Sequence, residues 1–149
     1  MVYLCLLDTN FLFVPLQFGI DIYEEIPRMV EEKSTLILLS GVEEELVEKI
    51  KRKKEKLVSK HGSAALHLVN DKVGRKIVEK MEIPRSPAVP VDDYIIHAAK
   101  SIRDAPEKHV DSPITGICIA TNDKGLKKKV LKEGFKTIHV RQKSQLMME

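Results

Sequence analysis

The N-terminal stretch constrains the fold most, because a continuous apolar run ends there in three polar residues. Residues 2–7 are apolar, and Asp8, Thr9 and Asn10 follow them directly. An uninterrupted apolar run of this length indicates a strand that is buried on both faces, as in a parallel sheet. Sites in open parallel sheets form just beyond the carboxyl ends of the strands. Asp8 is therefore well placed to hold a cation, although an aspartate at this point can also simply cap a turn.

The remainder of the chain alternates between strand and helix patterns. Further strands are expected at residues 35–39, 114–120 and 135–140. Helices are expected at residues 21–30, from Ser40 to a break at His61-Gly62-Ser63, from there to Met81, from Asp92 onward, and from Leu126 to Gly134. This alternation predicts an α/β fold with a mainly parallel sheet of about four or five strands flanked by helices. One domain is expected over residues 1–149, with a core at about 2–140 and a polar C-terminal tail at 141–149.

The composition is that of a globular domain. The chain has 149 residues, of which 43% are hydrophobic and 32% charged, and its net charge of +3 excludes no class of partner. Neither a signal peptide nor a membrane-spanning segment is apparent, so we expect a cytoplasmic protein without a membrane partner. Cys5 and Cys118 both lie in apolar runs, which predicts buried thiols and no disulfide.

Acidic side chains recur at equivalent points of the alternation. Asp8 and Asp123 each follow a buried strand, and Asp92-Asp93 begins a helix after a loop with three prolines. The triplet Glu43-Glu44-Glu45 lies in the first turns of the helix that follows the second strand. Right-handed crossovers place all of these points at one edge of the sheet. We therefore expect a cluster of carboxylates at that edge.

Such a cluster points to a cation, because carboxylates that are brought together repel one another and raise each other's pKa. Oxygen ligands suit Mg²⁺ or Mn²⁺, which can activate water and stabilise charge on a phosphoryl group. Each acid also has a simpler explanation, as a turn cap (Asp8), a helix N-cap (Asp92 or Asp93), a partner of a helix dipole (Asp123) or half of a capping box with Ser40 (Glu43). Capping does not explain why all of them fall at one edge, so we predict a joint metal site.

The order of these motifs resembles that of the PIN-domain nuclease family, from about Tyr3 to Val140. The resemblance rests on four short stretches, namely Leu7-Asp8-Thr9-Asn10, Val42-Glu43-Glu44-Glu45-Leu46, Asp92-Asp93-Tyr94-Ile95-Ile96 and Ala120-Thr121-Asn122-Asp123. The family pattern places an acid immediately before the leucine of the second stretch, which selects Glu45. In the third stretch it places an aspartate before an aliphatic and a small residue, which selects Asp92 and leaves Asp93 as a neighbouring alternative.

The resemblance implies a Rossmann-like three-layer fold and the Mg²⁺- or Mn²⁺-dependent endonucleolytic cleavage of RNA to a 5′-phosphate and a 3′-hydroxyl. The metal ligands and catalytic residues would be Asp8, Glu45, Asp92 and Asp123, supported by Thr9, Asn10, Thr121 and Asn122. Many members have a further acid two residues after the last aspartate. Here that position is Gly125, which weakens the expectation of a second metal.

Within the family, the long segment after Asn10 is most similar to the archaeal and eukaryotic branch concerned with ribosomal RNA processing. VapC-type toxins are also similar, and a toxin would require a cognate antitoxin. A third alternative, which Gly125 favours, is a PIN-like RNA-binding or scaffold module with little activity. The family often forms dimers, so a homodimer is also expected.

Two basic tracts fit a polyanionic partner such as RNA. Residues 49–60 contain seven basic side chains and one acid, and residues 124–129 contain four lysines. Contacts to phosphate give affinity without sequence information and make binding sensitive to salt. Solvated helix faces are the alternative explanation for both tracts. We predict RNA contacts at Arg52, Lys53, Lys124, Lys127, Lys128 and Lys129.

Overall fold

The computed structural model describes residues 1–149. The elements follow in the order β1 (Val2–Leu7), 3-10 helix η1 (Thr9–Phe13), α1 (Val14–Phe18), α2 (Ile22–Met29), β2 (Ser34–Leu39), α3 (Ser40–Arg52), α4 (Lys56–Gly74), β3 (Val78–Met81), α5 (Val91–Asp104), 3-10 helix η2 (Pro106–Lys108), β4 (Ile114–Ala120), α6 (Lys124–Lys132), β5 (Lys136–Arg141) and β6 (Gln145–Met148).

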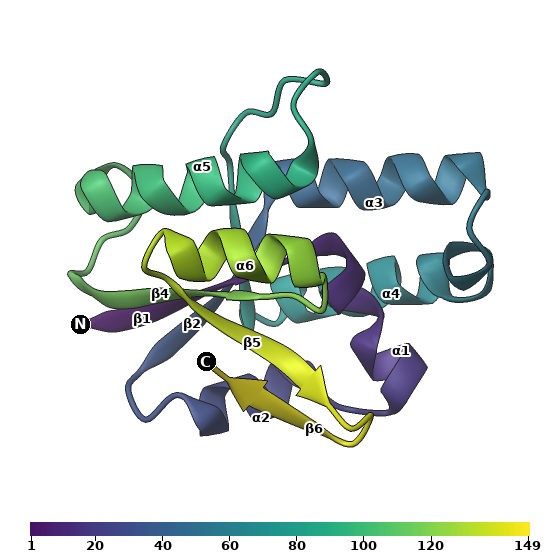
Figure 1. Cartoon of the computed structure of the whole chain (residues 1–149), viewed down its shortest axis with the longest axis horizontal. Coiled ribbons are helices and arrows are strands. Elements are labelled where there is room, and N and C mark those ends of the chain that lie inside the picture. Colours follow the sequence, from purple (N-terminus) through teal and green to yellow (C-terminus); the bar gives the residue numbers. More distant parts are fainter.

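A six-stranded sheet with the strand order β3-β2-β1-β4-β5-β6 forms the centre of the molecule (Figure 1). The first five strands are parallel, and β6 pairs antiparallel with β5. β1, the apolar run at the N-terminus, has partners on both sides, and its residues 4–7 are completely buried. The predicted α/β fold with a mainly parallel sheet is confirmed, but the sheet has six strands where four or five were expected.

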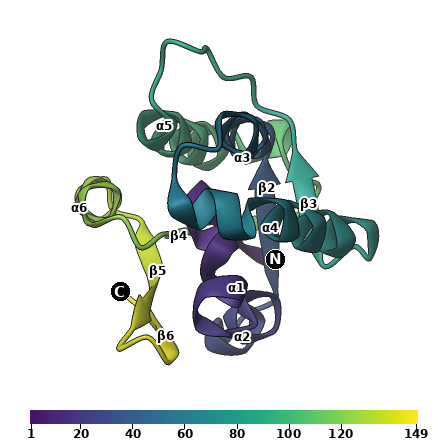
Figure 2. The same ribbon diagram turned by 90° about the vertical axis from the view of Figure 1, so that its right-hand side faces the viewer.

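Helices cover both faces of the sheet, as the end-on view in Figure 2 shows. On one side α5 contacts both α3 and α6, and on the other α2 packs against β2 and β6. α4 contacts α3, α1 and the edge strand β3. Cys5 and Cys118 are neighbours on β1 and β4, and both are buried free thiols, as predicted. None of the helices combines the length and the apolar composition that a membrane span needs.

The expected helix up to Met81 ends early and is followed by strand β3. α4 stops at Gly74, and Lys76 adopts a left-handed φ of 63°, which turns the chain toward the sheet. Only Val78 and Met81 are buried in β3, because this strand lies at the edge of the sheet. Val78 and Met81 happen to follow the apolar residues of α4 at helical spacing. The spacing of apolar residues alone therefore could not separate the strand from the helix.

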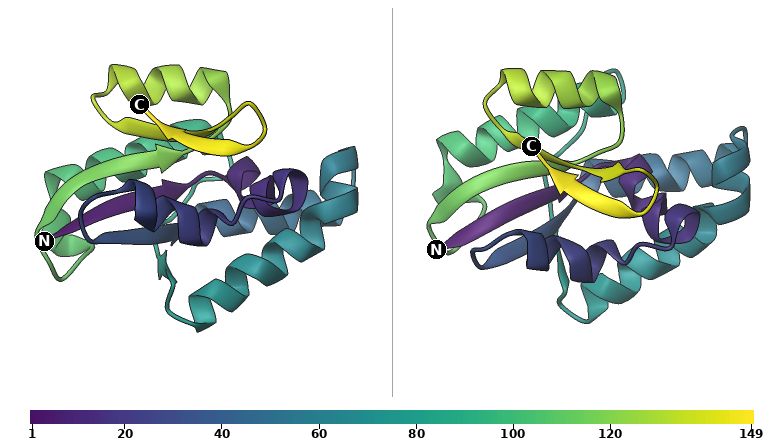
Figure 3. Two further views of the ribbon diagram at one scale, coloured as in Figure 1. Left: turned by 90° about the horizontal axis from the view of Figure 1, so that it is seen from below. Right: turned by 60° about the horizontal axis from the view of Figure 1, so that its bottom comes forward.

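The expected polar tail at residues 141–149 forms β6 instead, which lies beside β5 in a hairpin (Figure 3). The turn places Gln142 and Lys143 at φ values of 52° and 59°. Hairpin turns with two positive φ values usually contain Asn or Gly. The sequence therefore carries no turn signal at this point, and the strand was not expected.

The long helix expected from Ser40 breaks at a different place. α3 ends where Lys53 adopts a left-handed φ of 50°, and α4 begins at Lys56. The predicted break at residues 61–63 is wrong, because Gly62 lies inside α4 close to α3. A Cβ at Gly62 would lie 2.9 Å from Ile50 Cγ1, so glycine here permits the close contact of the two helices.

Ser40 does not form the predicted capping box with Glu43. Its hydroxyl donates to the carbonyl of Ile83 (3.0 Å) and accepts a hydrogen bond from the N–H of Ile83 (3.1 Å). The hydroxyl of Tyr94 donates to the same carbonyl (2.7 Å) and accepts from the N–H of Gly41 (3.0 Å). This buried network ties the start of α3 to the loop after β3 and to α5, and so fixes the two helices that carry the second and third acidic motifs.

Gly41→Ala should break this network. A Cβ at Gly41 would lie 2.5 Å from Tyr94 Cζ, so the ring must move and its hydrogen bonds must lengthen. We expect the free energy of unfolding, measured by urea denaturation, to fall by roughly 2–4 kcal/mol. Gly74→Ala is the matched control, because no atom lies within 4 Å of its new Cβ, and it should be neutral or slightly stabilising. Equal stabilities of the two variants would contradict this role of Tyr94.

Candidate active site

Asp8 lies at the point where the connectivity of the sheet changes direction. The chain passes from β1 to β2 on one side, and β4 later returns on the other side of β1. The crevice beyond the carboxyl ends of two such strands is the usual place for a site in an open parallel sheet. Leu7 is in register with Ala120, and the N–H of Asp8 donates to the carbonyl of Ala120 (3.0 Å). Asp8 and Thr121 therefore leave neighbouring strands side by side.

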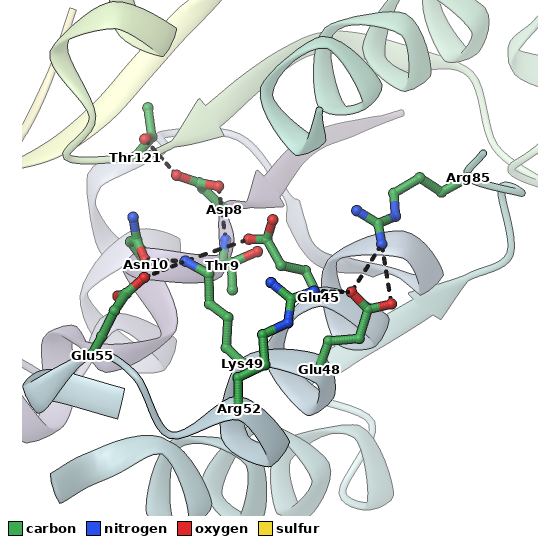
Figure 4. Close-up of polar contacts among 10 residues, drawn as sticks. All are labelled: Asp8, Thr9, Asn10, Glu45, Glu48, Lys49, Arg52, Glu55, Arg85 and Thr121. Carbon is green, nitrogen blue, oxygen red and sulfur yellow. Dashed lines mark hydrogen bonds and ion pairs between the residues drawn. The ribbon is translucent and has the colours of Figure 1, made fainter. Parts of the chain in front are cut away.

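The hydroxyl of Thr121 connects two of the predicted acidic positions. It donates to Asp8 Oδ2 (2.7 Å), as Figure 4 shows, and accepts from the N–H of Asp123 (3.0 Å). The N–H of Thr9 donates to the other carboxylate oxygen, Asp8 Oδ1 (2.8 Å). Both oxygens are thus held in place, and Asp8 is only 4% exposed. Asp8 does cap the turn, but it is also a buried and oriented carboxylate.

The environment of Asp8 disfavours its charge. Burial is the main cause that raises the pKa of Asp8 to about 6, and the negative charges of Asp92 and Glu45 add to the effect. The hydrogen bonds from Thr121 and Thr9 act in the opposite direction. A carboxylate that is costly to ionise, and whose neighbours are also acids, is typical of a functional site.

Asp92 lies close enough to Asp8, Glu45 and Asp123 for their charges to interact. Burial raises the pKa of Asp92, and the charges of Asp123 and Glu45 raise it further, against the positive charge of Lys129. Asp92 and Asp93 both lie in the first turn of α5, but Asp93 is exposed, and its Oδ1 lies 3.3 Å from Lys129 Nζ. The geometry therefore favours Asp92 over Asp93 as the member of the acidic group.

Glu45 is held by a lysine that the sequence did not single out. Lys49 Nζ lies 3.8 Å from Glu45 Oε1, 3.8 Å from Glu55 Oε1 and 3.5 Å from Asn10 Oδ1 (Figure 4). Glu43 is paired instead with Lys80 (2.6 Å). Lys49 is one basic residue among seven in its tract, and only the packing of α3 shows that its ammonium group faces the acids.

Asp123 is the N-cap of α6 as well as a member of the acidic group. Its Oδ1 accepts from the N–H of Leu126 (3.0 Å), so the simpler explanation for this residue also holds. A Cβ at Gly125 would lie 3.2 Å from Asp123 Oδ1, which is a crowded contact. Glycine at this position therefore leaves room for the capping carboxylate, which would have to shift slightly beside a larger residue.

The supporting residues predicted beside the acids differ in their roles. Thr121 orients Asp8, and Thr9 does so through its backbone N–H. Asn10 is exposed and accepts the Lys49 hydrogen bond through Oδ1. The side-chain oxygen of Asn122 accepts from the N–H of Val140 (2.9 Å), so it fastens the turn before α6 to β5 and does not orient Asp8.

Comparison with known proteins identifies the family of the chain and supports its fold. The family model described as "PIN like domain" matches residues 5–143 of the chain. The chain belongs to the PIN-like domain family. The solved structure of the PIN domain endonuclease Utp24 is similar to it with a TM-score of 0.70 and 22% sequence identity, over 99% of this chain and 91% of that chain. Comparison with curated proteins gave no match.

The basic residues predicted to contact RNA lie in this PIN-like domain on α3 and α6. Arg52 Nη2 lies 3.3 Å from Glu48 Oε2, and Lys53 follows α3 as its C-cap. Lys127 Nζ lies 3.1 Å from Glu149 Oε2, and Lys129 is paired with Asp93, as described above. Lys124 and Lys128 are exposed at the start and in the middle of α6, whose N-cap is Asp123. α6 therefore begins at the acidic edge, and its lysines extend along the helix from that edge.

The residues at this edge fit the divalent cation that the family resemblance implies. The candidate ligands are carboxylates, which Mg²⁺ and Mn²⁺ prefer. They lie close enough for the charge of one to raise the pKa of another, as it does at Asp8 and Asp92. Thr9 Oγ1, in the residue after Asp8, is buried without a hydrogen-bond partner. No three acidic, histidine or cysteine side chains adopt an arrangement that could hold a metal ion as they stand. The fit is therefore one of charge and ligand type.

Asp8→Asn should stabilise the metal-free protein at neutral pH. The pKa of Asp8 is about 6 in the folded protein, above its ordinary value of 3.8, so the folded state binds more protons between these two values. Stability is therefore lost as the pH rises through this window. One pKa unit corresponds to about 1.4 kcal/mol, so the charge of Asp8 costs roughly 3 kcal/mol above pH 6 or so.

Thermal unfolding in a chelating buffer tests this expectation. The melting temperature of Asp8→Asn should exceed that of the parent protein at pH 7, and the difference should shrink toward pH 4. Asp71→Asn, which changes an exposed carboxylate on α4, is the control and should show no such pH dependence. A difference in melting temperature that stays constant with pH would contradict the raised pKa of Asp8.

Proposed function

We propose that this PIN-like protein is an endoribonuclease that depends on Mg²⁺ or Mn²⁺. The observation that carries the proposal is the buried carboxylate of Asp8, oriented at the switch point of the sheet by a threonine that also binds the backbone of Asp123. The ion would be held by Asp8, Glu45, Asp92 and Asp123. The similarity to a PIN domain endonuclease supports this reaction class, and the basic residues of α3 and α6 support RNA as the substrate.

The chain's own residues prepare the site for this chemistry. A bound divalent ion supplies a water molecule activated for attack and positive charge beside the phosphoryl oxygens. With its pKa at about 6, Asp8 is ionised at neutral pH and can act as a ligand. Thr121 and the N–H of Thr9 fix the direction of its oxygens, and Lys49 keeps Glu45 beside them. The backbone phosphates of the RNA would bind the exposed lysines of α6.

Ribosomal RNA processing is the pathway that we favour. The long segment after Asn10, residues 11–26, contains the rest of η1, all of α1 and the first part of α2. The solved structure of Utp24 matches nearly the whole chain. The substrate would then be a ribosomal RNA with an accessible cleavage site in a single-stranded or structured region.

A second candidate function is RNA binding without useful catalysis. Gly125 removes one acid of the family pattern, and no three ligands stand ready to hold an ion. A titration with Mn²⁺ separates the two functions, because only the nuclease needs to bind the ion at the acidic edge.

Cleavage of labelled RNA tests the proposed reaction. The parent protein should cut single-stranded or structured RNA in Mg²⁺ or Mn²⁺, should leave 5′-phosphate ends, and should lose all activity in a chelator. Asp8→Asn and Asp123→Asn should lower the rate by more than about 100-fold, because each removes a proposed metal ligand. Asp71→Asn should cut at the parent rate. If Asp8→Asn cuts RNA as fast as the parent, the proposed mechanism is wrong.

Thr121→Val should weaken the site without removing any carboxylate. In the parent protein the hydroxyl of Thr121 orients Asp8 and lowers the pKa of its carboxyl group. Because the substitution removes this hydroxyl, we expect metal affinity to fall by about 10–100-fold. The pH at which activity is half-maximal should also rise. Thr137→Val is the matched control, because the hydroxyl of Thr137 is buried in β5 without a hydrogen-bond partner. Calorimetric titration with Mn²⁺ measures the affinities, and equal values for the two variants would rule out this role of Thr121.

A further inference from the structure

A pocket lies beside the acidic edge, between α3 and the proline-rich loop that precedes α5. Its volume is about 500 Å³. α3 contributes Glu45, Glu48, Lys49 and Arg52, and the other wall is formed by Arg85 and residues 87–91. Glu45 belongs to both the pocket and the acidic group, and Val91 directly precedes Asp92. We call this cavity the Arg85 pocket.

Arg85 is the unusual member of the pocket. Its side chain is only 9% exposed, whereas arginine side chains are rarely buried unless they are paired. Nη2 lies 3.3 Å and 3.4 Å from the two carboxylate oxygens of Glu48, but Nε is buried without any hydrogen-bond partner. A buried guanidinium N–H that lacks an acceptor costs free energy. The Arg85 side chain therefore has donor capacity that the protein itself does not use.

Positive charge exceeds negative charge in the Arg85 pocket. It contains three cationic side chains and the two carboxylates Glu45 and Glu48. Glu48 binds both Arg85 and Arg52, whose Nη2 lies 3.3 Å from Glu48 Oε2 (Figure 4). The Glu48 carboxylate thus pairs with two guanidinium groups that could otherwise bind an external anion. Its own side chain is 46% exposed, so it can move aside at little cost.

We propose that the Arg85 pocket binds a backbone phosphate of the RNA strand whose neighbouring phosphodiester lies at the acidic edge. Arginine recognises phosphate through two parallel N–H···O bonds. A phosphate would supply an acceptor to Nε, which has none, and would replace Glu48 as the acceptor of Nη2. Glu48 occupies this site in the absence of RNA and is displaced when RNA binds. The inference rests on the proposed function, because it assigns the path of the substrate next to the same carboxylates.

The alternative is that Arg85 and Glu48 form an ion pair that only fastens the proline-rich loop. The two roles predict opposite effects of Glu48→Gln on RNA binding. If Glu48 competes with phosphate, its neutralisation frees Arg85 and Arg52 and strengthens binding. If the pair only fastens the loop, the same change loosens the loop and does not strengthen binding.

The experiment measures the affinity of the full-length chain for a fluorescent single-stranded RNA in a chelator, so that no cleavage occurs, over a range of salt concentrations. Glu48→Gln should bind about 3–10-fold more tightly than the parent, and Arg85→Gln should bind about 10-fold more weakly, with the salt slope reduced by about 1. In the double variant with Glu48→Gln and Arg85→Gln, the gain in RNA affinity from Glu48→Gln should be smaller. Only Arg52 is then left to be freed from its ion pair with Glu48.

Asp71 and Arg75 on α4 give matched controls, because they form an exposed ion pair of 3.1 Å that does not line the pocket. Asp71→Asn and Arg75→Gln make the same changes in net charge and should alter the affinity less than twofold or so. The proposal is overturned if Glu48→Gln binds no more tightly than Asp71→Asn. It is also overturned if folded Arg85→Gln binds as tightly as Arg75→Gln. Should Arg85→Gln fail to fold, the Glu48→Gln comparison decides alone.

Cleavage in Mn²⁺ separates this inference from the proposed function. RNA binding that depends on Arg85, without any cleavage by the parent, would support the phosphate pocket and refute the nuclease. Cleavage by the parent together with unchanged binding by both pocket variants would support the nuclease and refute the phosphate pocket. A parent protein that binds no RNA at low salt would refute both.

Discussion

The hydrogen bond from Thr121 to Asp8 is the interaction on which the site depends. It joins residues that are 113 positions apart in the chain, at the ends of the two central strands. The same hydroxyl accepts the N–H of Asp123, so one threonine sets the relative positions of the first and last acidic motifs. The rigid register of β1 and β4 holds this arrangement, because neither strand can slip without moving its whole buried face.

Ionising the carboxylates of this site costs free energy, which a bound cation would offset. Several carboxylates meet at one edge, and the central one is buried, so burial and repulsion both work against ionisation. Two lysines offset part of this cost, because Lys49 lies beside Glu45 and the positive charge of Lys129 lowers the pKa of Asp92. We therefore expect this PIN-like domain to gain stability when a divalent ion neutralises these carboxylates.

Much of the fold and most of the acidic site follow from sequence, because abrupt changes from apolar to polar residues mark the ends of buried strands. Asp8 and Asp123 are predicted in this way, and the structure places both beside Thr121. Lys49 and Arg85 could not be found, because their roles depend on how α3 and the proline-rich loop are rotated toward the acids. Residues 141–149 were missed for a local reason, namely a hairpin turn whose positive φ values fall on residues other than glycine or asparagine.

The most direct test of the account is the position of a bound ion. Crystals of the parent protein soaked in Mn²⁺ should give an anomalous difference peak in diffraction data collected at the manganese absorption edge. This peak should lie between the carboxylates of Asp8, Asp92 and Asp123, beyond the carboxyl ends of β1 and β4. A well-diffracting crystal with no peak there, or with peaks only at other surface acids, would contradict the central claim that this edge is a metal site.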